Sequence, residues 1–146
     1  MAIDPRAVVA PDARIAGDVE IGPFTVIGPE VSIGPGCRIG PHVVINGPTR
    51  MGAGNRVFQF ASIGEDPQDK KYGGERTELV IGERNTFREY VSVNRGTVTG
   101  GGTTRMTAVN IYNLPGAAGC EAAGSDMGPY GYRLWNSPAS RYACAW

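Results

Sequence analysis

The stretch between residues 15 and 45 reads IAGDVE-IGPFTV-IGPEVS-IGPGCR-IGPHVV-I and carries isoleucine at every sixth position. The same spacing continues without a slip on both sides: Ile3, Val9, Ile15, Ile21, Ile27, Ile33, Ile39, Ile45, Met51, Val57 and Ile63. Four positions after each of these comes a second set of mostly small or β-branched residues, such as Val19, Thr25 and Cys37. The period of six excludes an α-helix, because an apolar helical stripe recurs every 3.6 residues and the repeated prolines would interrupt it.

Each hexad is typical of a short strand followed by a turn supplied by Gly, Pro or Asp. Three hexads close one coil of about 18 residues, and stacked coils bury the aliphatic positions in a narrow interior where small residues fit. Regular turns would also fit a small β-sandwich, but eleven consecutive positions in register favour the solenoid. The sequence therefore predicts an all-β parallel β-helix of hexapeptide repeats over residues 1–105.

The repeat is interrupted once in this region. It lapses after Ile63 and resumes in phase at Ile81, Phe87 and Val93. The interruption predicts an inserted loop over residues 64–80, which holds both lysines of the chain. A rigid scaffold concentrates binding groups in such loops, although a solvated, charge-rich surface loop is the alternative on composition alone.

The composition excludes several classes of function. Lys plus Arg and Asp plus Glu are both 14, so the zero net charge gives no reason to expect a nucleic acid or an anionic membrane as partner. No stretch approaches the roughly 20 apolar residues of a membrane span, and the start MAIDPRAVV lacks the features of a signal peptide, so we expect a cytoplasmic protein. Three scattered cysteines and one histidine predict neither a disulfide framework nor a metal site, and we expect no cofactor.

Two strings are far more specific than the hexads: FQFASIGEDPQDKKYGGERTELVIG at 58–82 and RNTFREYVSVNRGTVTGGGTTR at 84–105. With them, residues 1–105 resemble the UDP-N-acetylglucosamine acyltransferase family, which catalyses the first step of lipid A synthesis. The resemblance implies a left-handed helix, a homotrimer, and transfer of a 3-hydroxyacyl chain from acyl carrier protein to the 3-hydroxyl of UDP-N-acetylglucosamine. Other hexapeptide acyltransferases share the helix but lack the loop string.

The resemblance also implies roles for individual residues. Gln68, Asp69 and Lys71 match the positions that contact the acceptor nucleotide sugar, with Lys71 suited to phosphate and Asp69 to a sugar hydroxyl. A further set matches a structural segment: Arg88, Glu89, Arg95, Gly96 and Thr97. Asn94 stands where relatives often have histidine, and we interpret it as an outward or interfacial residue.

The family's general base is a histidine in a coil that follows the GGG-x-T segment, and no histidine follows it here. Residues 106–146 form a tail without hexads, predicted to be irregular or disordered; a reading-frame change or an evolved capping segment would each explain it. His42 falls at an outward position and is interpreted as a solvent or subunit-interface residue. Cys37 is expected to pack inward, whereas Cys120 and Cys144 lack a partner histidine.

We therefore assign no catalytic residue and expect this chain to be a truncated acyltransferase, inactive or severely impaired. The alternative is a non-catalytic β-helix module that binds a nucleotide sugar or serves as a trimerisation scaffold. A hexapeptide carbonic anhydrase is excluded, because it needs three zinc-ligand histidines.

Overall fold

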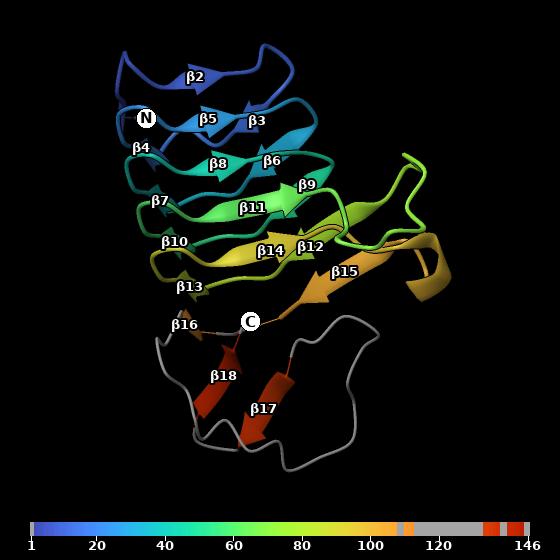
Figure 1. The fold of residues 1–146 in the computed structure, drawn as a ribbon. Helices are drawn as coiled ribbons and strands as arrows, with labels where there is room; N and C mark the ends of the chain where they lie inside the picture. Colours follow the sequence, from blue (N-terminus) through green and yellow to red (C-terminus); the bar gives the residue numbers. More distant parts are fainter. Residues whose placement is uncertain (1, 108–109, 113–132, 138–139, 145–146) are drawn as a thin grey trace.

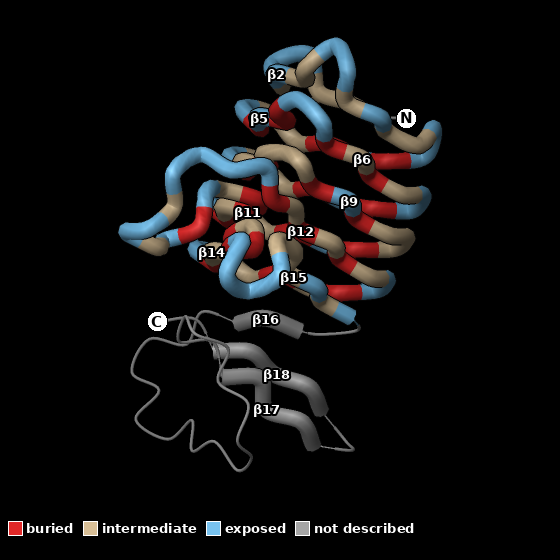
Figure 2. The backbone as a smooth tube through the Cα atoms, turned by 90° about the vertical axis from the view of Figure 1, so that its right-hand side faces the viewer, coloured by how far each residue is buried: buried red, intermediate tan, exposed pale blue. Residues whose placement is uncertain are grey.

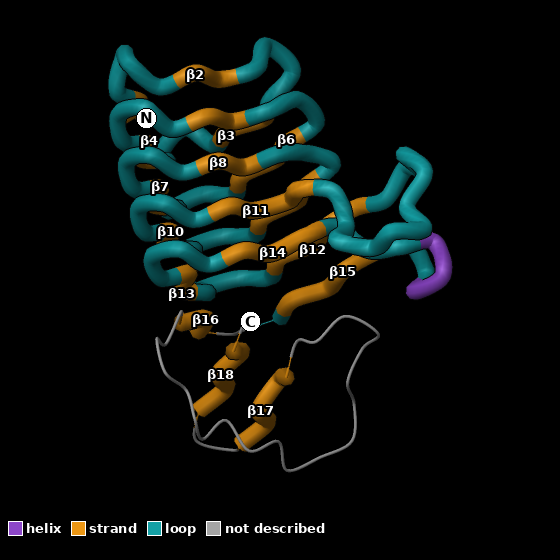
Figure 3. The backbone as a smooth tube through the Cα atoms, viewed as in Figure 1, coloured by secondary structure: helices purple, strands orange, loops and turns teal. Residues whose placement is uncertain are grey.

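A computed structural model describes residues 2–107, 110–112, 133–137 and 140–144, with side chains through residue 107. The chain winds into a stack of triangular coils, and each coil contributes one short strand to each of three sheets (Figures 1 and 3). Sheet A contains β1 (Ala2–Ile3), β4 (Glu20–Ile21), β7 (Arg38–Ile39), β10 (Arg56–Val57) and β13 (Thr86–Phe87), followed by β16 (Asn110–Tyr112), β18 (Ser140–Cys144) and β17 (Arg133–Ser137). Sheet B contains β2 (Val8–Val9), β5 (Val26–Ile27), β8 (Val44–Ile45), β11 (Ser62–Glu65) and β14 (Ser92–Asn94). Sheet C contains β3 (Arg14–Ile15), β6 (Val31–Ile33), β9 (Thr49–Met51), β12 (Glu78–Ile81) and β15 (Thr103–Met106).

Parallel pairing between successive coils confirms the predicted coil length. Ile21 is aligned with Ile39, and Ile27 with Ile45, so equivalent residues of neighbouring coils are 18 positions apart. In Figure 1 the strands of sheet B cross the front from left to right, and the chain then returns behind them as it descends. This course is left-handed, and the fold is the left-handed parallel β-helix that the resemblance implied.

The predicted aliphatic positions form the core. Ile27, Ile33, Ile45 and Ile63 are almost completely buried, and the partly exposed members lie in the first coil, above which no other described coil stacks. The second predicted set is also inward: Val19, Thr25, Val31, Cys37, Val43, Thr49, Asn55 and Ala61 are all buried. The hexad pattern thus identifies both inward positions of each hexad.

Two asparagines stack inside the prism at the corner between sheets C and A. Oδ1 of Asn55 accepts hydrogen bonds from the backbone N–H and from Nδ2 of Asn85, both at 2.8 Å. Nδ2 of Asn55 donates to the carbonyls of Gly52 and Gly82 at 2.8 and 2.9 Å. Because both side chains are fully buried, these bonds replace the water that the amides lose on folding.

The interruption after Ile63 is an insertion between β11 and β12. Leu79 is aligned with Thr49, a separation of 30 residues in place of 18, so 12 residues have been added. A second excursion follows β14 and contains the short 3-10 helix Val98–Gly100. Leu79 is aligned with Thr104, a separation of 25, so this excursion adds seven residues. Both excursions leave the prism on the same side (Figure 3).

Three strands follow β15 in the described part of the chain. β16 (Asn110–Tyr112) adds to sheet A in parallel with β13, and Ile111 is aligned with Phe87. β17 (Arg133–Ser137) and β18 (Ser140–Cys144) form an antiparallel pair that extends the same sheet. The proposed boundary at residue 105 and the irregular tail stay predictions, because residues 113–132 lie outside the described part. No helix among the described residues is long and apolar enough to cross a membrane.

We predict that Asn55→Ala lowers the free energy of unfolding by about 1–3 kcal/mol, because it leaves buried donors of Asn85 without their acceptor. Urea unfolding followed by circular dichroism measures the change. Arg56→Ala, at the neighbouring exposed position, is the control and should change the stability by no more than about 0.5 kcal/mol. Equal effects of the two substitutions would contradict a structural role for the asparagine ladder.

Candidate functional site

The inserted loop leaves the prism at the corner between sheets B and C and forms the largest exposed projection of the β-helix (Figure 2). It begins at Gly64, whose φ of +80° lies in the region that favours glycine. A Cβ at this position would lie 2.0 Å from the carbonyl oxygen of Asn46 and 2.3 Å from Oγ1 of Thr49. Only glycine therefore lets the chain turn out of the β-helix here.

The three predicted site residues lie together in this loop. Gln68 and Lys71 are exposed, and Asp69 is half-buried. Oδ1 of Asp69 accepts a hydrogen bond from the backbone N–H of Lys71 at 3.0 Å, and the Asp69 carbonyl accepts one from the N–H of Tyr72 at 2.9 Å. This turn brings an amide, a carboxylate and an ammonium group to one exposed segment, a set that can bind hydroxyl and phosphate groups. Their role as ligand contacts stays a prediction.

Arg95 fastens the base of the loop from the next coil. Its side chain is 10% exposed and donates to the carbonyls of Gly47 and Gly64 at 2.7 and 2.9 Å. It also forms an ion pair with Asp66 and donates to the hydroxyl of Tyr72 at 3.3 Å. Sequence reasoning grouped Arg95 with structural residues, and the structure shows which part of the fold it holds.

A second attachment lies on the outside of the loop. Arg76 donates to Glu30 of an earlier coil through both terminal nitrogens, with one distance of 3.0 Å. The hydrogen bond from Arg76 lowers the pKa of Glu30 below its ordinary range. Both side chains are exposed, so solvent screens this pair and its contribution to stability is small.

Asn94, which the sequence led us to interpret as an outward or interfacial residue, does not face solvent. It is 8% exposed, because the loop covers it. Its Oδ1 accepts a hydrogen bond from the hydroxyl of Ser92 at 3.0 Å, and its Nδ2 donates to the carbonyl of Asp66. Asn94 therefore lies beneath the loop, and both the oxygen and the nitrogen of its side-chain amide form hydrogen bonds.

The single histidine lies away from this loop. His42 is exposed at the corner between sheets A and B, where its ring stacks between Phe24 and Phe60 at centroid distances of 5.1 and 5.4 Å. Tyr90 continues the stack below Phe60, and Arg6 lies over Phe24 above it. The loop, by contrast, leaves from the corner between sheets B and C. The exposed setting agrees with the predicted solvent or interface residue.

Sequence reasoning missed this aromatic column, although a signal was present. Each ring residue stands three positions after an inward residue of sheet A, so one ring occurs in each coil at the same place. The four ring residues also have φ values between 53° and 64°. Side chains other than glycine rarely adopt this conformation; here the turn directs their rings outward along one edge of the prism.

Of the three cysteines, Cys37 is the one whose side chain the structure describes. Cys37 is fully buried, as predicted, and burial raises the pKa of its thiol. Cys120 and the side chain of Cys144 lie outside the described part of the chain. Among residues with described side chains, no group of three or more His, Cys, Asp or Glu residues could hold a metal ion.

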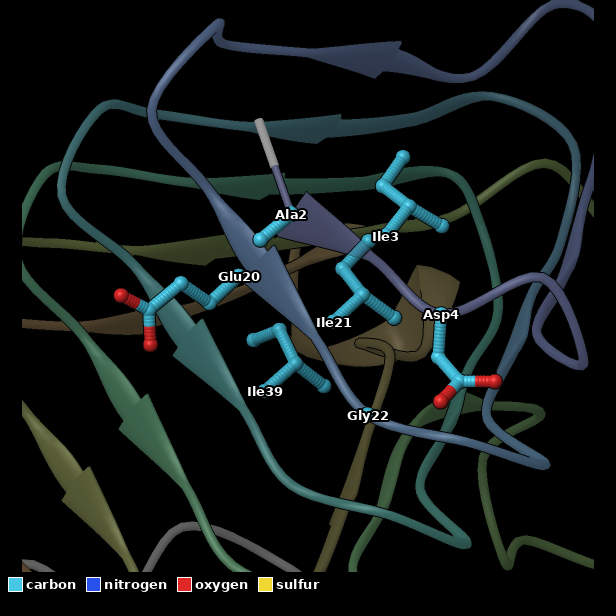
Figure 4. A pocket seen from close by; sticks show the side chains of 7 residues that line it. All are labelled: Ala2, Ile3, Asp4, Glu20, Ile21, Gly22 and Ile39. Carbon is cyan, nitrogen blue, oxygen red and sulfur yellow. The ribbon is translucent and has the colours of Figure 1, made fainter.

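A separate concavity of about 450 Å³ opens beside the first coils (Figure 4). Its lining is mostly aliphatic, with Ile3, Ile21 and Ile39 from successive strands of sheet A. The carboxylates at its rim are Asp4, which is paired with Arg6, and Glu20, which is paired with Arg38. Since the loop residues are not among its lining, this concavity is the open end of the inward column and not the candidate site.

The outward strand positions differ in charge between the three sheets. In sheet B they are Val8, Val26, Val44, Ser62 and Ser92. In sheet A they include Glu20, Arg38 and Arg56, and in sheet C they include Arg14, Arg50 and Arg105. Sheet B is thus the least charged face of the described β-helix, with Glu65 at the end of β11 as its charged strand residue, and Val8 on it is 62% exposed.

Comparisons with known proteins show similarity between the β-helix and several transferases. Residues 12–47 match the family described as bacterial transferase hexapeptide (six repeats). The chain is 59% identical over 102 residues to the acyl-[acyl-carrier-protein]–UDP-N-acetylglucosamine O-acyltransferase of Xanthomonas euvesicatoria, covering 70% of this chain and 39% of that protein. The enzyme of that name from Myxococcus xanthus is 60% identical over 110 residues, covering 75% of this chain and 43% of the relative.

Solved structures agree with the sequence relatives. The structure of LpxA from Acinetobacter baumannii superposes with a TM-score of 0.74 and 46% identity, covering 76% of this chain and 43% of that one. UDP-N-acetylglucosamine O-acyltransferase from Moraxella catarrhalis gives a TM-score of 0.70 and 42% identity, covering 75% of this chain and 46% of that one. The chain spans about two fifths of the length of the curated relatives it matches.

Proposed function

We propose that this chain, whose hexapeptide region is homologous to the N-terminal part of the UDP-N-acetylglucosamine O-acyltransferases, binds UDP-N-acetylglucosamine through its inserted loop. A match over 102 contiguous positions of a 146-residue chain includes residues 45–102 wherever it begins, and so includes the whole loop. Identity of 59% across that stretch is the observation that carries the proposal.

The chemistry of the three predicted site residues of the loop fits a nucleotide sugar. The ammonium group of Lys71 can pair with a phosphate, and the carboxylate of Asp69 can accept a hydrogen bond from a sugar hydroxyl. The amide of Gln68 can donate and accept. We assign all three to acceptor binding and none to catalysis.

The reaction that the relatives' names imply is acyl transfer from acyl carrier protein to the sugar. The 3-hydroxyl oxygen attacks the thioester carbonyl and forms a C–O bond while a base takes the hydroxyl proton. The C–S bond then breaks, and the carrier protein leaves as its thiol after the sulfur takes up that proton. The chain has one histidine, and His42 is stacked between two rings at a different corner from the loop. We therefore infer that this chain binds the acceptor but is severely impaired in transfer. The cytoplasm stays the predicted location.

Titration with UDP-N-acetylglucosamine, followed by calorimetry, tests the proposal. We expect saturable binding, and we expect Lys71→Ala to weaken it about tenfold or more, because a hydrogen bond to a charged group contributes about 1.5–3 kcal/mol. Lys70→Ala, one position away and also exposed, is the matched control and should bind like the unchanged chain.

Three outcomes are informative. Loss of affinity in Lys71→Ala alone supports the assignment of the loop. Equal losses of affinity in both lysine variants would mean that the loop attracts the ligand only through its positive charge and not through a specific contact with Lys71. Absence of saturable binding by the unchanged chain would leave the scaffold alternative, in which the β-helix serves only for assembly.

We further propose that the chain forms a homotrimer through sheet B. The outward positions of this face carry valine and serine, whereas sheets A and C carry arginine and glutamate along theirs. Exposed valines that recur along one face favour association, because burying them removes apolar surface from water.

Sedimentation analysis of Val26→Arg tests the homotrimer. This substitution puts a charge on sheet B, and we expect it to convert the trimer to monomer. Ser32→Arg places the same charge at an outward position of sheet C in the same pair of coils and should leave the trimer intact. A monomeric unchanged chain, or equal behaviour of the two variants, would contradict assembly through sheet B.

A further inference from the structure

Arg95 joins segments of the chain that are far apart in sequence. Its Nη1 donates to the carbonyl of Gly47, at the corner of an earlier coil, and to that of Gly64, where the loop begins. Its Nη2 contacts the carboxylate of Asp66 and, at 3.3 Å, the hydroxyl of Tyr72. Its Nε has no acceptor among the described residues. The guanidinium therefore fastens the scaffold to both sides of the loop tip.

The segment between Asp66 and Tyr72, which Arg95 holds at both ends, contains the residues proposed to contact the ligand. Asp66 and Tyr72 lie on either side of Gln68, Asp69 and Lys71. The hydroxyl of Tyr72 also donates to the carbonyl of Glu75 at 3.0 Å, which extends the attachment to the part of the loop that leads back to β12. Displacement of Arg95 would release the loop at Asp66 and Tyr72 together.

We propose that Arg95 is a positioning residue that holds the segment from Asp66 to Tyr72 in the conformation that binds the acceptor. The inference rests on the proposed function of the loop. The planar fork of arginine can address several acceptors at fixed angles, whereas the single ammonium group of lysine cannot span them. Burial strengthens the hydrogen bonds of Arg95, because its side chain is only 10% exposed and is shielded from water that would compete for them.

The exposed Arg76–Glu30 pair does not replace this attachment. The Arg76 side chain is 74% exposed, and a screened surface pair contributes little to holding a loop. It also attaches the loop after Tyr72 and Glu75, away from the ligand segment. Arg95 is therefore the contact whose removal should change the loop most.

Limited trypsin digestion of the full chain measures this role without any ligand, because Lys70 and Lys71 lie at the loop tip. We expect Arg95→Gln to speed cleavage after these lysines about tenfold or more, since hydrogen bonds to a charged group are lost. Arg88→Gln is the matched control: it removes a partly exposed arginine paired with Glu89 at the other corner of sheet B and should leave the rate unchanged. Equal rates in Arg95→Gln and the unchanged chain would overturn the proposal.

Tyr72→Phe keeps the proposal testable if Arg95→Gln does not fold. It removes only the hydroxyl that accepts from Arg95 and donates to Glu75, and we expect a smaller but measurable increase in cleavage after Lys71. An unchanged rate in a folded Tyr72→Phe variant would count against Arg95 as the clamp.

Titration with UDP-N-acetylglucosamine separates positioning from bulk stability. We expect Arg95→Gln to weaken binding about tenfold while its melting temperature stays close to that of Arg88→Gln, and Arg95→Lys to restore part of the affinity. If the unchanged chain binds and Arg95→Gln binds equally well, the positioning role is wrong and the proposed function stands. If the unchanged chain does not bind, the proposed function fails, and the trypsin comparison alone decides whether Arg95 holds the loop.

Discussion

Hydrogen bonding between one coil and the next is the constraint on which the rest of this structure depends. In the coils before the inserted loop, each strand pairs in parallel with strands 18 residues away in its own sheet, and each hexad sends two residues into the interior between the sheets. A residue's position in the hexad therefore decides whether it is buried, forms a turn or faces outward. The same constraint stacks Phe24, His42, Phe60 and Tyr90 into one column, because their turns repeat with the coil.

The β-helix could be predicted from sequence because the stacking of coils requires apolar or small residues at the same positions of every hexad. Ile21, Ile27 and Ile33 fall on three different sheets, yet each is buried as the period requires. The loop could also be located, because its 12 added residues are two hexads and leave the phase unchanged. The excursion before β15 adds seven residues, so Met106 joins the core one position later than the hexads predict.

The attachments of the loop could not be predicted in the same way. Arg95 contacts Gly47 across 48 positions of sequence, which are two coils plus the 12 inserted residues. Its contacts with Asp66 and Tyr72, and that of Arg76 with Glu30, instead join residues of the loop to the β-helix. Such contacts depend on the path of the loop, which no repeat specifies. The burial of Asn94 has the same cause, since the loop covers an outward position that would otherwise face solvent. The aromatic column did follow the period, but the period says nothing about which outward residues will stack.

Binding and catalysis separate in this account, because the loop carries groups suited to the acceptor while the one histidine is held at another corner. An acyl-transfer assay with 3-hydroxyacyl carrier protein and UDP-N-acetylglucosamine tests that separation most directly, with the Acinetobacter baumannii LpxA assayed in parallel. Loss of a general base costs about 10²–10⁴-fold in rate, so we predict that the O-acylated sugar nucleotide accumulates at least about a hundredfold more slowly with this chain. Formation of product at a rate comparable to that of LpxA would contradict the account.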